Sequence, residues 1–212
     1  MTTPTTFEDA YRRGEPPWVI DQPQPAVVEI EREGVLAGRV LDLGCGTGEH
    51  TILLARLGYR VLGADAAPAA IERARDRARL AGVDAEFTVA DAMDPVDLGD
   101  LGRFTTILDS ALFHVFDPDD RARYARALTG VVEPGGRVIV LALSTRGPGF
   151  GPQIDDDAVP QAFVAPDWEV EAVRPSTYRG RVTHPDQADD LGRGIGELVD
   201  LPATLALVRR TG

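Results

Sequence analysis

Residues 40–48 read VLDLGCGTG, and this stretch decides how the rest of the chain is interpreted. A short, mostly apolar run, residues 40–43, leads directly into a loop with glycine at every second position. Gly44, Gly46 and Gly48 carry no Cβ and can adopt positive φ angles, so the backbone can lie directly against a ligand. The pattern predicts a buried strand followed by a ligand-binding turn.

The spacing of the glycines indicates the kind of ligand. A helix that begins at Glu49 points its free N–H groups and its partial positive charge at the turn. The dinucleotide-binding pattern G-x-G-x-x-G needs a third glycine at the position of Glu49, and this chain lacks it. A nicotinamide dinucleotide is therefore disfavoured. A tight turn that binds nothing is the structural alternative.

Short apolar runs alternate with segments of helical periodicity, which is the pattern of a parallel sheet covered by helices. Pro68 and Pro118 are placed as at the first turn of a helix, and Gly58 and Gly82 as at a helix end. The sequence PGG at residues 134–136 predicts a turn before a strand. The candidate strands are residues 40–43, 61–64, 86–90, 105–108 and 137–143.

The form D-x-G-x-G-x-G of residues 42–48 resembles motif I of the class I methyltransferases, which bind S-adenosylmethionine (SAM). The resemblance implies an α/β fold, with a Rossmann-like, seven-stranded, mostly parallel sheet, helices on both faces and an antiparallel final strand. Residues 168–173 and 205–208 then supply the last two strands as an antiparallel pair. The cofactor contacts that it implies in the motif are Asp42, Gly44, Cys45, Gly46 and Gly48.

Two acids follow the next strands. Asp65 lies 17 residues after Gly48, close to the separation of about 20 that one helix and one strand impose. Its carboxylate can accept two hydrogen bonds, as both ribose hydroxyls require. The resemblance implies that Asp91 accepts the adenine amino group, and Ala66 and Ala92 are predicted to contact the cofactor beside these acids. A surface-loop aspartate and a loop cap are the structural alternatives.

Three further segments extend the resemblance. Residues 108–116, LDSALFHVF, match the motif IV region, where Asp109 and Ser110 are the implied cofactor contacts. Residues 15–25 precede motif I, and residues 147–152 form a loop rich in Gly and Pro. Together with motif I, they resemble the small actinobacterial methyltransferases that act on heterocyclic toxins and on phenol- or quinolone-like metabolites. Thiopurine methyltransferases are more distant relatives.

The resemblance implies a single domain with two parts. Residues 1–38 are expected to form an N-terminal arm that folds over the site as a lid, and residues 39–212 the SAM-binding methyltransferase domain. Trp18 in the arm is predicted to pack against the methionine part of SAM or against the substrate. Anchoring of the arm by Trp18 is an equally weighted alternative.

Methyl transfer requires chiefly that the nucleophile and the methyl group are held at attack distance in a dry pocket. A hydroxyl nucleophile would benefit from a base, and His114 is the best-placed candidate, with a helix cap or a buried polar contact as the alternative. Asp21 and Asp109 are carboxylates near the expected pocket that could orient a substrate amine or accept its proton. His50 is predicted to lie on the helix surface or against the cofactor, and His184 has no predicted role.

The composition excludes several kinds of partner. The 34 acidic and 22 basic residues give a net charge of -12, so neither nucleic acid nor a membrane surface is expected to bind.

The single cysteine, Cys45, excludes an internal disulfide and is predicted to pack in the loop. With no apolar run of membrane length and no signal core, a cytoplasmic location is expected. The consecutive acids at 155–157 diverge in direction, so no metal is predicted.

We therefore predict a SAM-dependent methyltransferase that modifies an O, N or S atom of a small aromatic or heterocyclic metabolite or toxin, as a monomer or homodimer. A nicotinamide-dependent oxidoreductase is one alternative, weakened by the missing glycine and by the lack of a Tyr-x-x-x-Lys pair. A SAM-binding regulatory protein without a productive acceptor site is the other.

Overall fold

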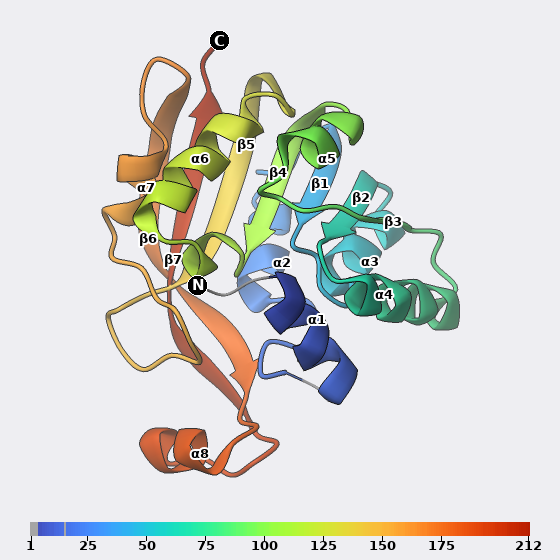
Figure 1. The fold of residues 1–212 in the computed structure, drawn as a ribbon, viewed down its shortest axis with the longest axis vertical. Coiled ribbons are helices and arrows are strands. Elements are labelled where there is room, and N and C mark those ends of the chain that lie inside the picture. The colour runs from blue at the N-terminus through green and yellow to red at the C-terminus, as the bar shows by residue number, and fades with distance from the viewer. Residues whose placement is uncertain (1–3, 15) are drawn as a thin grey trace.

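One sheet organises the computed structural model, which describes residues 4–14 and 16–212 (Figure 1). Within that part of the chain its seven strands are β1 (Arg39–Leu43), β2 (Arg60–Asp65), β3 (Glu86–Val89), β4 (Phe104–Ser110), β5 (Val132–Leu143), β6 (Trp168–Arg181) and β7 (Leu198–Arg210). Their order is β3-β2-β1-β4-β5-β7-β6, and only β7 runs antiparallel to its neighbours. The predicted fold class is confirmed.

The order of the strands reverses at β1. From β1 the chain proceeds through β2 to β3 on one side, whereas β4 and β5 lie on the other side. The loops that leave the carboxyl ends of β1 and β4 therefore diverge, and open α/β sheets bind their ligands at such a reversal. The glycine loop and the segment after β4 meet there.

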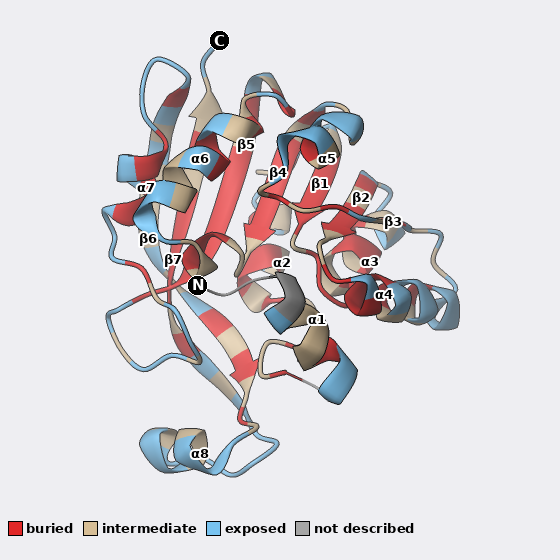
Figure 2. Cartoon of the chain, viewed as in Figure 1, coloured by how far each residue is buried: buried red, intermediate tan, exposed pale blue. Residues whose placement is uncertain are grey.

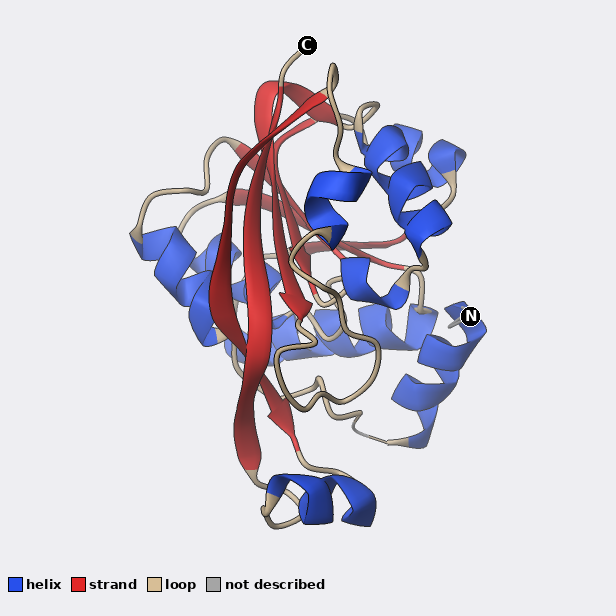
Figure 3. Ribbon diagram, turned by 90° about the vertical axis from the view of Figure 1, so that its left-hand side faces the viewer, coloured by secondary structure: helices blue, strands red, loops and turns tan. Residues whose placement is uncertain are grey.

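Helices cover both faces of the sheet (Figure 3). Proline occupies the first turn of most of them, where its missing N–H would have no partner in any case. They are α1 (Pro4–Arg13), α2 (Pro25–Arg32), α3 (Glu49–Arg56), α4 (Pro68–Ala81), α5 (Pro95–Asp100), the 3₁₀ turn η1 (Phe113–Val115), α6 (Pro118–Leu128), α7 (Ala158–Ala162) and α8 (Pro185–Leu191). Among these described helices, none has the length and apolar character of a membrane span.

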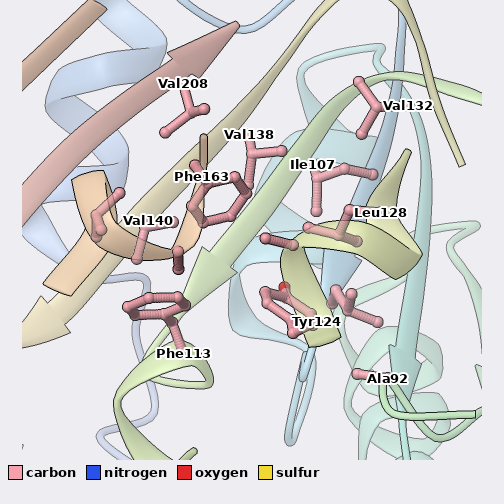
Figure 4. Close-up of a cluster of buried hydrophobic side chains, with 14 of the residues drawn as sticks. Ala92, Ile107, Phe113, Tyr124, Leu128, Val132, Val138, Val140, Phe163 and Val208 are labelled. Atoms are coloured by element: carbon pink, nitrogen blue, oxygen red, sulfur yellow. The ribbon is translucent and has the colours of Figure 1, made fainter. Parts of the chain in front are cut away.

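Two apolar clusters form the main core, one on each face of the sheet. Successive side chains of a strand point to opposite faces, so Val138 and Val140 of β5 join one cluster while Ile139 and Leu141 join the other. The first cluster lies under α5, α6 and α7, and its aromatic members include Phe113, Tyr124 and Phe163 (Figure 4). The central strands are buried along most of their length, whereas α8 has no buried residue (Figure 2).

Several strands extend beyond their predicted ends. β5 begins at Val132, so residues 134–136 belong to an irregular strand rather than to a turn before it; Gly135 has a φ of 78°, and the pairing with β4 shifts register nearby. β6 and β7 continue as a long hairpin with α8 at its tip (Figure 1). In the outer half of this hairpin a few buried side chains, such as Tyr178 and Leu201, alternate with half-buried and exposed polar residues, so it lacks the continuous apolar pattern that marks a strand.

A structural role emerges for His184. Its side chain accepts a hydrogen bond from Asp186 N, and the Gln187 side chain accepts one from His184 N, which together form a capping box at the start of α8.

The residues before β1 divide into two parts. α2 buries Ala26, Val27 and Ile30 in the second core cluster, so the predicted lid of residues 1–38 is too long. α1 instead packs against α4, where Glu8 accepts a hydrogen bond from Ala69 N at 2.9 Å. Residues 1–3 and 15 of the predicted lid lie outside the described residues.

Candidate active site

A cavity of about 840 Å³ opens at the carboxyl edge of the parallel strands. One part, which we call the glycine-loop end, is lined by residues 43–47, 49, 65–66 and 90–93. The other part, the α6 end, is lined by residues 114–117, Asp120, Arg121, Arg123, Leu143 and Phe150. Trp18 and Tyr178 contribute to the same cavity.

Gly44 and Gly46 line the glycine-loop end as predicted, with φ angles of 75° and 54°. Gly46 N donates a hydrogen bond to Asp65 Oδ2 at 2.9 Å, so the loop is tied to the end of β2. A Cβ at Gly46 would lie 2.8 Å from Tyr11 Oη. Glycine is therefore required here for the arm to lie close to the loop.

Asp42 and Gly48 support the loop but do not line the cavity, contrary to their predicted cofactor contacts. The buried Asp42 accepts hydrogen bonds from Thr51 N (3.1 Å) and Thr51 Oγ1 (2.6 Å), which fixes the start of α3, and burial raises its pKa to about 6. A Cβ at Gly48 would lie 2.8 Å from the Phe87 ring, so this glycine allows the loop to pack on β3. Cys45 lines the cavity as a buried thiol, and burial raises its pKa.

Asp65 ends β2 with its carboxylate in the cavity. Its Oδ2 accepts from Gly46 N and its Oδ1 accepts from Ala67 N, both at 2.9 Å. Each oxygen keeps a second lone pair, so the carboxylate can still accept hydrogen bonds from two ligand hydroxyls. Burial raises the pKa of Asp65. Ala66 lines the cavity beside it.

Asp91 and Ala92 line the cavity after β3. Asp91 Oδ1 accepts a hydrogen bond from Met93 N at 2.8 Å, and Asp91 N donates to Asp97 Oδ2 at 2.9 Å. Met93, which was not predicted, lines the cavity two residues further along. Its unbranched thioether is suited to contact with a flat ring. A polar acceptor and a soft apolar surface thus stand together after β3.

The arm reaches the cavity through Trp18, whose Nε1 donates a hydrogen bond to Tyr11 Oη at 2.9 Å. The Trp18 ring packs edge-on against Phe7 and Tyr11, with centroid distances of 5.8 Å and 6.2 Å. Trp18 therefore ties the segment after α1 back onto α1, in an apolar cluster that includes Ala67, Ala69 and Ala70. Its contact with a ligand stays a prediction.

Gln24 joins the arm to two other parts of the fold. Its backbone N donates a hydrogen bond to His50 Nε2 at 3.1 Å, while its side chain pairs with the backbone N and O of Arg179 in β6 at 2.7 Å and 2.8 Å. Burial lowers the pKa of His50 to about 4, so this imidazole is neutral and serves as an acceptor. His50 lines the cavity, in keeping with the predicted helix-surface or cofactor position.

Asp109 does not line the cavity, although both a catalytic role and a cofactor contact were predicted for it. Its carboxylate is fully buried and accepts hydrogen bonds from Leu112 N (3.1 Å), Phe113 N (3.0 Å) and Tyr124 Oη (2.8 Å). Burial raises its pKa to about 6. Asp109 therefore holds the turn into η1. Its neighbour Ser110 lines the cavity as predicted.

His114 lines the α6 end, but its hydrogen bond does not suit a general base. Leu143 N donates to His114 Nδ1 at 3.0 Å, and a backbone N–H can only donate. Burial, with a smaller contribution from Arg121, lowers the pKa of His114 to about 4. The neutral ring therefore carries its proton on Nε2, which leaves that nitrogen with a hydrogen to donate and no lone pair to accept one.

Asp21 lies outside the cavity lining, contrary to its predicted catalytic role. Its half-exposed carboxylate pairs with Arg77 at 2.9 Å and with Arg181 at 3.1 Å. Its φ of 61° is rare for a residue other than glycine. Asp21 therefore connects α4 to β6 beneath the arm.

The acids at 155–157 form part of the loop after β5. Asp155 accepts a hydrogen bond from Thr145 Oγ1, and Asp156 pairs with Arg146 at 3.0 Å. Asp157 stands at the N-cap of α7 without a side-chain cap bond. Among residues 4–14 and 16–212, no group of three His, Cys, Asp or Glu is placed to hold a metal ion.

Comparison with known proteins agrees with this geometry. The model of a methyltransferase domain family matches residues 40–136. The 2-heptyl-1-hydroxyquinolin-4(1H)-one methyltransferase of Mycobacteroides abscessus is 34% identical over 183 residues, which are 80% of this chain and 79% of that protein. The chain belongs to the SAM-dependent methyltransferases.

Two solved structures resemble the methyltransferase over nearly its whole length. One comes from work on the conversion of a disulfide bond into a thioacetal group during echinomycin biosynthesis; it has a TM-score of 0.84 and 36% identity, covering 98% of this chain and 92% of that one. A SAM-dependent methyltransferase from Anabaena variabilis has a TM-score of 0.73 and 18% identity, covering 96% and 91%.

SAM fits the residues at the glycine-loop end of the methyltransferase. Gly44 and Gly46 line the cavity, Asp65 has lone pairs for hydroxyl donors, and Asp91 Oδ2 has no hydrogen bond among the described residues. When bound, SAM supplies an activated methyl group to an acceptor. The enzyme itself supplies the shape and the polarity of the site.

Sequence analysis named only His114 as a functional side chain of the α6 end. Phe150 lies in the Gly- and Pro-rich loop of residues 147–152 that the resemblance included, whereas Tyr178 reaches the cavity from a hairpin that no local motif marks. A signal existed for Arg121, which precedes the buried Tyr124 by three residues. Residues three apart share a helix face, so Arg121 is on the side of α6 that faces the protein.

Proposed function

We propose that the methyltransferase acts on a small aromatic or heterocyclic metabolite or toxin and methylates an O, N or S atom of it. The shape of the cavity carries this proposal. Its volume of about 840 Å³ is near the top of the range of about 300–1,000 Å³ for small-molecule sites, so a compact acceptor has room beside the cofactor. Trp18, Phe116, Phe150 and Tyr178 supply aromatic surface.

The relatives support the same class of acceptor. The name of the Mycobacteroides abscessus relative specifies a hydroxylated quinolone, which is a small heterocycle. We carry this class over to the present enzyme, without the particular compound, since Leu143, Phe150 and Tyr178 of the cavity lie outside the matched residues 40–136.

The proposed cofactor contacts follow from the glycine-loop end. The Asp65 carboxylate accepts hydrogen bonds from both ribose hydroxyls, and the Asp91 carboxylate accepts one from the adenine amino group. The backbone of Gly44 and Gly46 faces the methionine part of SAM. The acceptor atom would attack the methyl carbon of SAM in line with the departing sulfur, and no covalent protein intermediate is needed. The contribution of the protein is orientation in a dry cavity, an effect that reaches about 7–11 kcal/mol in well-aligned systems.

Mass spectrometry tests the proposal directly. The protein is incubated with methyl-labelled SAM and a panel of phenols, thiols, hydroxyquinolones and amines, with Asp65→Ala as the matched negative control. Transfer of label to an aromatic or heterocyclic compound is expected. Tight SAM binding without transfer to any compound would instead favour a SAM-binding regulatory protein.

We also propose a cytoplasmic enzyme that acts without nucleic acid, as a monomer or homodimer. The single cysteine supports the reducing compartment, and the net charge of -12 opposes binding to phosphate backbones. Light scattering of the purified chain distinguishes the two oligomeric states.

A further inference from the structure

Arg121 brings an unpaired cation into the α6 end of the cavity. Its Nε is buried without a hydrogen-bond partner, and no carboxylate of the described residues lies within ion-pair distance of its guanidinium. The guanidinium carbon stands 5.4 Å from the centre of the Phe113 ring. Arg123, two residues away, is by contrast paired with Asp120 at 2.7 Å. Burial lowers the pKa of Arg121, but a guanidinium remains charged in proteins.

The charges around Arg121 leave its cation incompletely balanced. Asp117, which also lines the cavity, and Asp155 attract it, but neither carboxylate lies within ion-pair distance of the guanidinium; Asp117 caps α6 through Asp120 N at 2.9 Å, and Asp155 accepts from Thr145 Oγ1. A partly desolvated cation is stabilised most by a direct, charge-assisted hydrogen bond to an anion. The protein does not provide that anion.

His114 adds a second donor to the same end. Leu143 N occupies its Nδ1, so the hydrogen is on Nε2, which has no acceptor among the described residues. Nε2 is not fully buried, and because His114 lines the cavity, this nitrogen is open to it. The ligand-facing groups of His114 and Arg121 are therefore both hydrogen-bond donors, and neither can take a proton from an acceptor.

Building on the proposed function, we infer that the acceptor binds with its nucleophilic atom already ionised, as the oxygen of an acidic hydroxyl or the sulfur of a thiolate. Arg121 is the specificity-determining residue and His114 a second donor that positions the anion. One bond forms between the anionic atom and the methyl carbon, while the C–S bond of SAM breaks and its electron pair stays on sulfur. No proton is transferred, and the negative charge of the acceptor and the positive charge of the SAM sulfur are neutralised in the same step.

Equilibrium binding tests the inference without turnover. The probes are 4-nitrophenol, which is ionised at about pH 8.5 unlike a simple phenol with a pKa near 10, and 4-nitrotoluene, its uncharged counterpart of similar size. Calorimetry in the presence of S-adenosylhomocysteine should show that wild type prefers the phenolate. Arg121→Gln should weaken phenolate binding about tenfold, corresponding to one charge-assisted hydrogen bond, and leave 4-nitrotoluene binding unchanged.

Three variants sharpen the test. Arg126→Gln removes an exposed arginine from the same helix and should preserve the preference for the phenolate. Arg121→Lys should retain more of the phenolate preference than Arg121→Gln does. His114→Gln should keep most of this preference, because an amide can accept a hydrogen bond from Leu143 N and still donate one to the anion. Wild type without a preference, or equal losses for both probes in Arg121→Gln, would overturn the inference.

A pH profile separates this inference from catalysis by a base. Over a series of phenols, the midpoint of the turnover profile should follow the pKa of each phenol. A midpoint common to all of the phenols would overturn the inference in favour of a protein base. A phenolate preference that depends on Arg121, without methylation of any compound, would refute the proposed function and leave the anion site intact.

Discussion

The two ends of the cavity are built in different ways. The glycine-loop end consists of three short segments that leave β1, β2 and β3, and its polar contacts are backbone groups and carboxylates that are already tied to one another. The α6 end is assembled from side chains of the arm, η1, α6, a loop and a hairpin. Local backbone geometry thus defines the first, whereas packing between distant elements defines the second.

This difference has an energetic counterpart. Removing one side chain from the glycine-loop end should disturb ligand binding before folding, because several hydrogen bonds hold each loop in place. Removing the buried Asp109 from beneath the α6 end should disturb folding first, because this carboxylate is the acceptor of three buried donors.

The largest effect is expected for Asp109→Ala, which tests the support of the α6 end. The substitution leaves Leu112 N, Phe113 N and Tyr124 Oη buried without an acceptor, at a cost of about 3 kcal/mol or more in the free energy of unfolding. Urea denaturation measures it. Asp100→Ala, an exposed carboxylate on α5, should change stability by less than about 0.5 kcal/mol. Equal stabilities of the two variants would show that Asp109 does not support this end.

Asp65→Ala tests the glycine-loop end. Loss of a charge-assisted acceptor for two hydroxyls should weaken SAM binding by about 1–3 kcal/mol, as measured by calorimetry. Binding of 4-nitrophenol at the α6 end should change little, since the ends are built independently. Unchanged SAM affinity would remove Asp65 from the proposed ribose contact.

The third prediction concerns pH and His114. Because the folded-state pKa is lowered to about 4 from an ordinary value near 6.5, the stability that His114 contributes is present above about pH 6.5 and is lost as pH falls towards about 4. Protonation would place a hydrogen on Nδ1 against Leu143 N–H. Between about pH 7 and pH 5, wild type should lose about 2 kcal/mol more than His114→Gln in urea denaturation. Parallel losses would contradict the neutral buried state.

The smallest effect is expected in the arm, several of whose residues line the cavity. Tyr11→Phe removes the acceptor of Trp18 Nε1 and should destabilise the packing of Trp18 on α1 by about 1 kcal/mol. Faster amide hydrogen exchange in residues 4–24, with an unchanged unfolding midpoint, is the expected result. Arg13→Gln, which removes only an exposed pair with Asp9, is the matched control. Unchanged exchange in Tyr11→Phe would show that the arm is held elsewhere.

Reasoning from the sequence placed Asp65 and Asp91 at the edge of the sheet where they line the cavity, because the carboxyl ends of parallel strands share one edge. Their contacts with the cofactor stay predictions. The same reasoning did not place Asp21, Asp42 and Asp109 correctly, because their carboxylates point into ion pairs or into the interior. A carboxylate beside a predicted pocket can satisfy the protein itself, and a one-dimensional pattern does not distinguish the two uses.

The amino-acid sequence alone determined the sheet, the glycine loop and the cofactor, because alternating apolar patterns and glycines at fixed spacing impose backbone conformations locally. The tertiary structure decided what the cavity offers to an acceptor. Only the approach of β5 to η1 places the proton of His114 on Nε2, and only the packing of α6 leaves Arg121 without a carboxylate. Side-chain direction and charge pairing depend on elements far apart in the chain, and so they arise only when the chain folds.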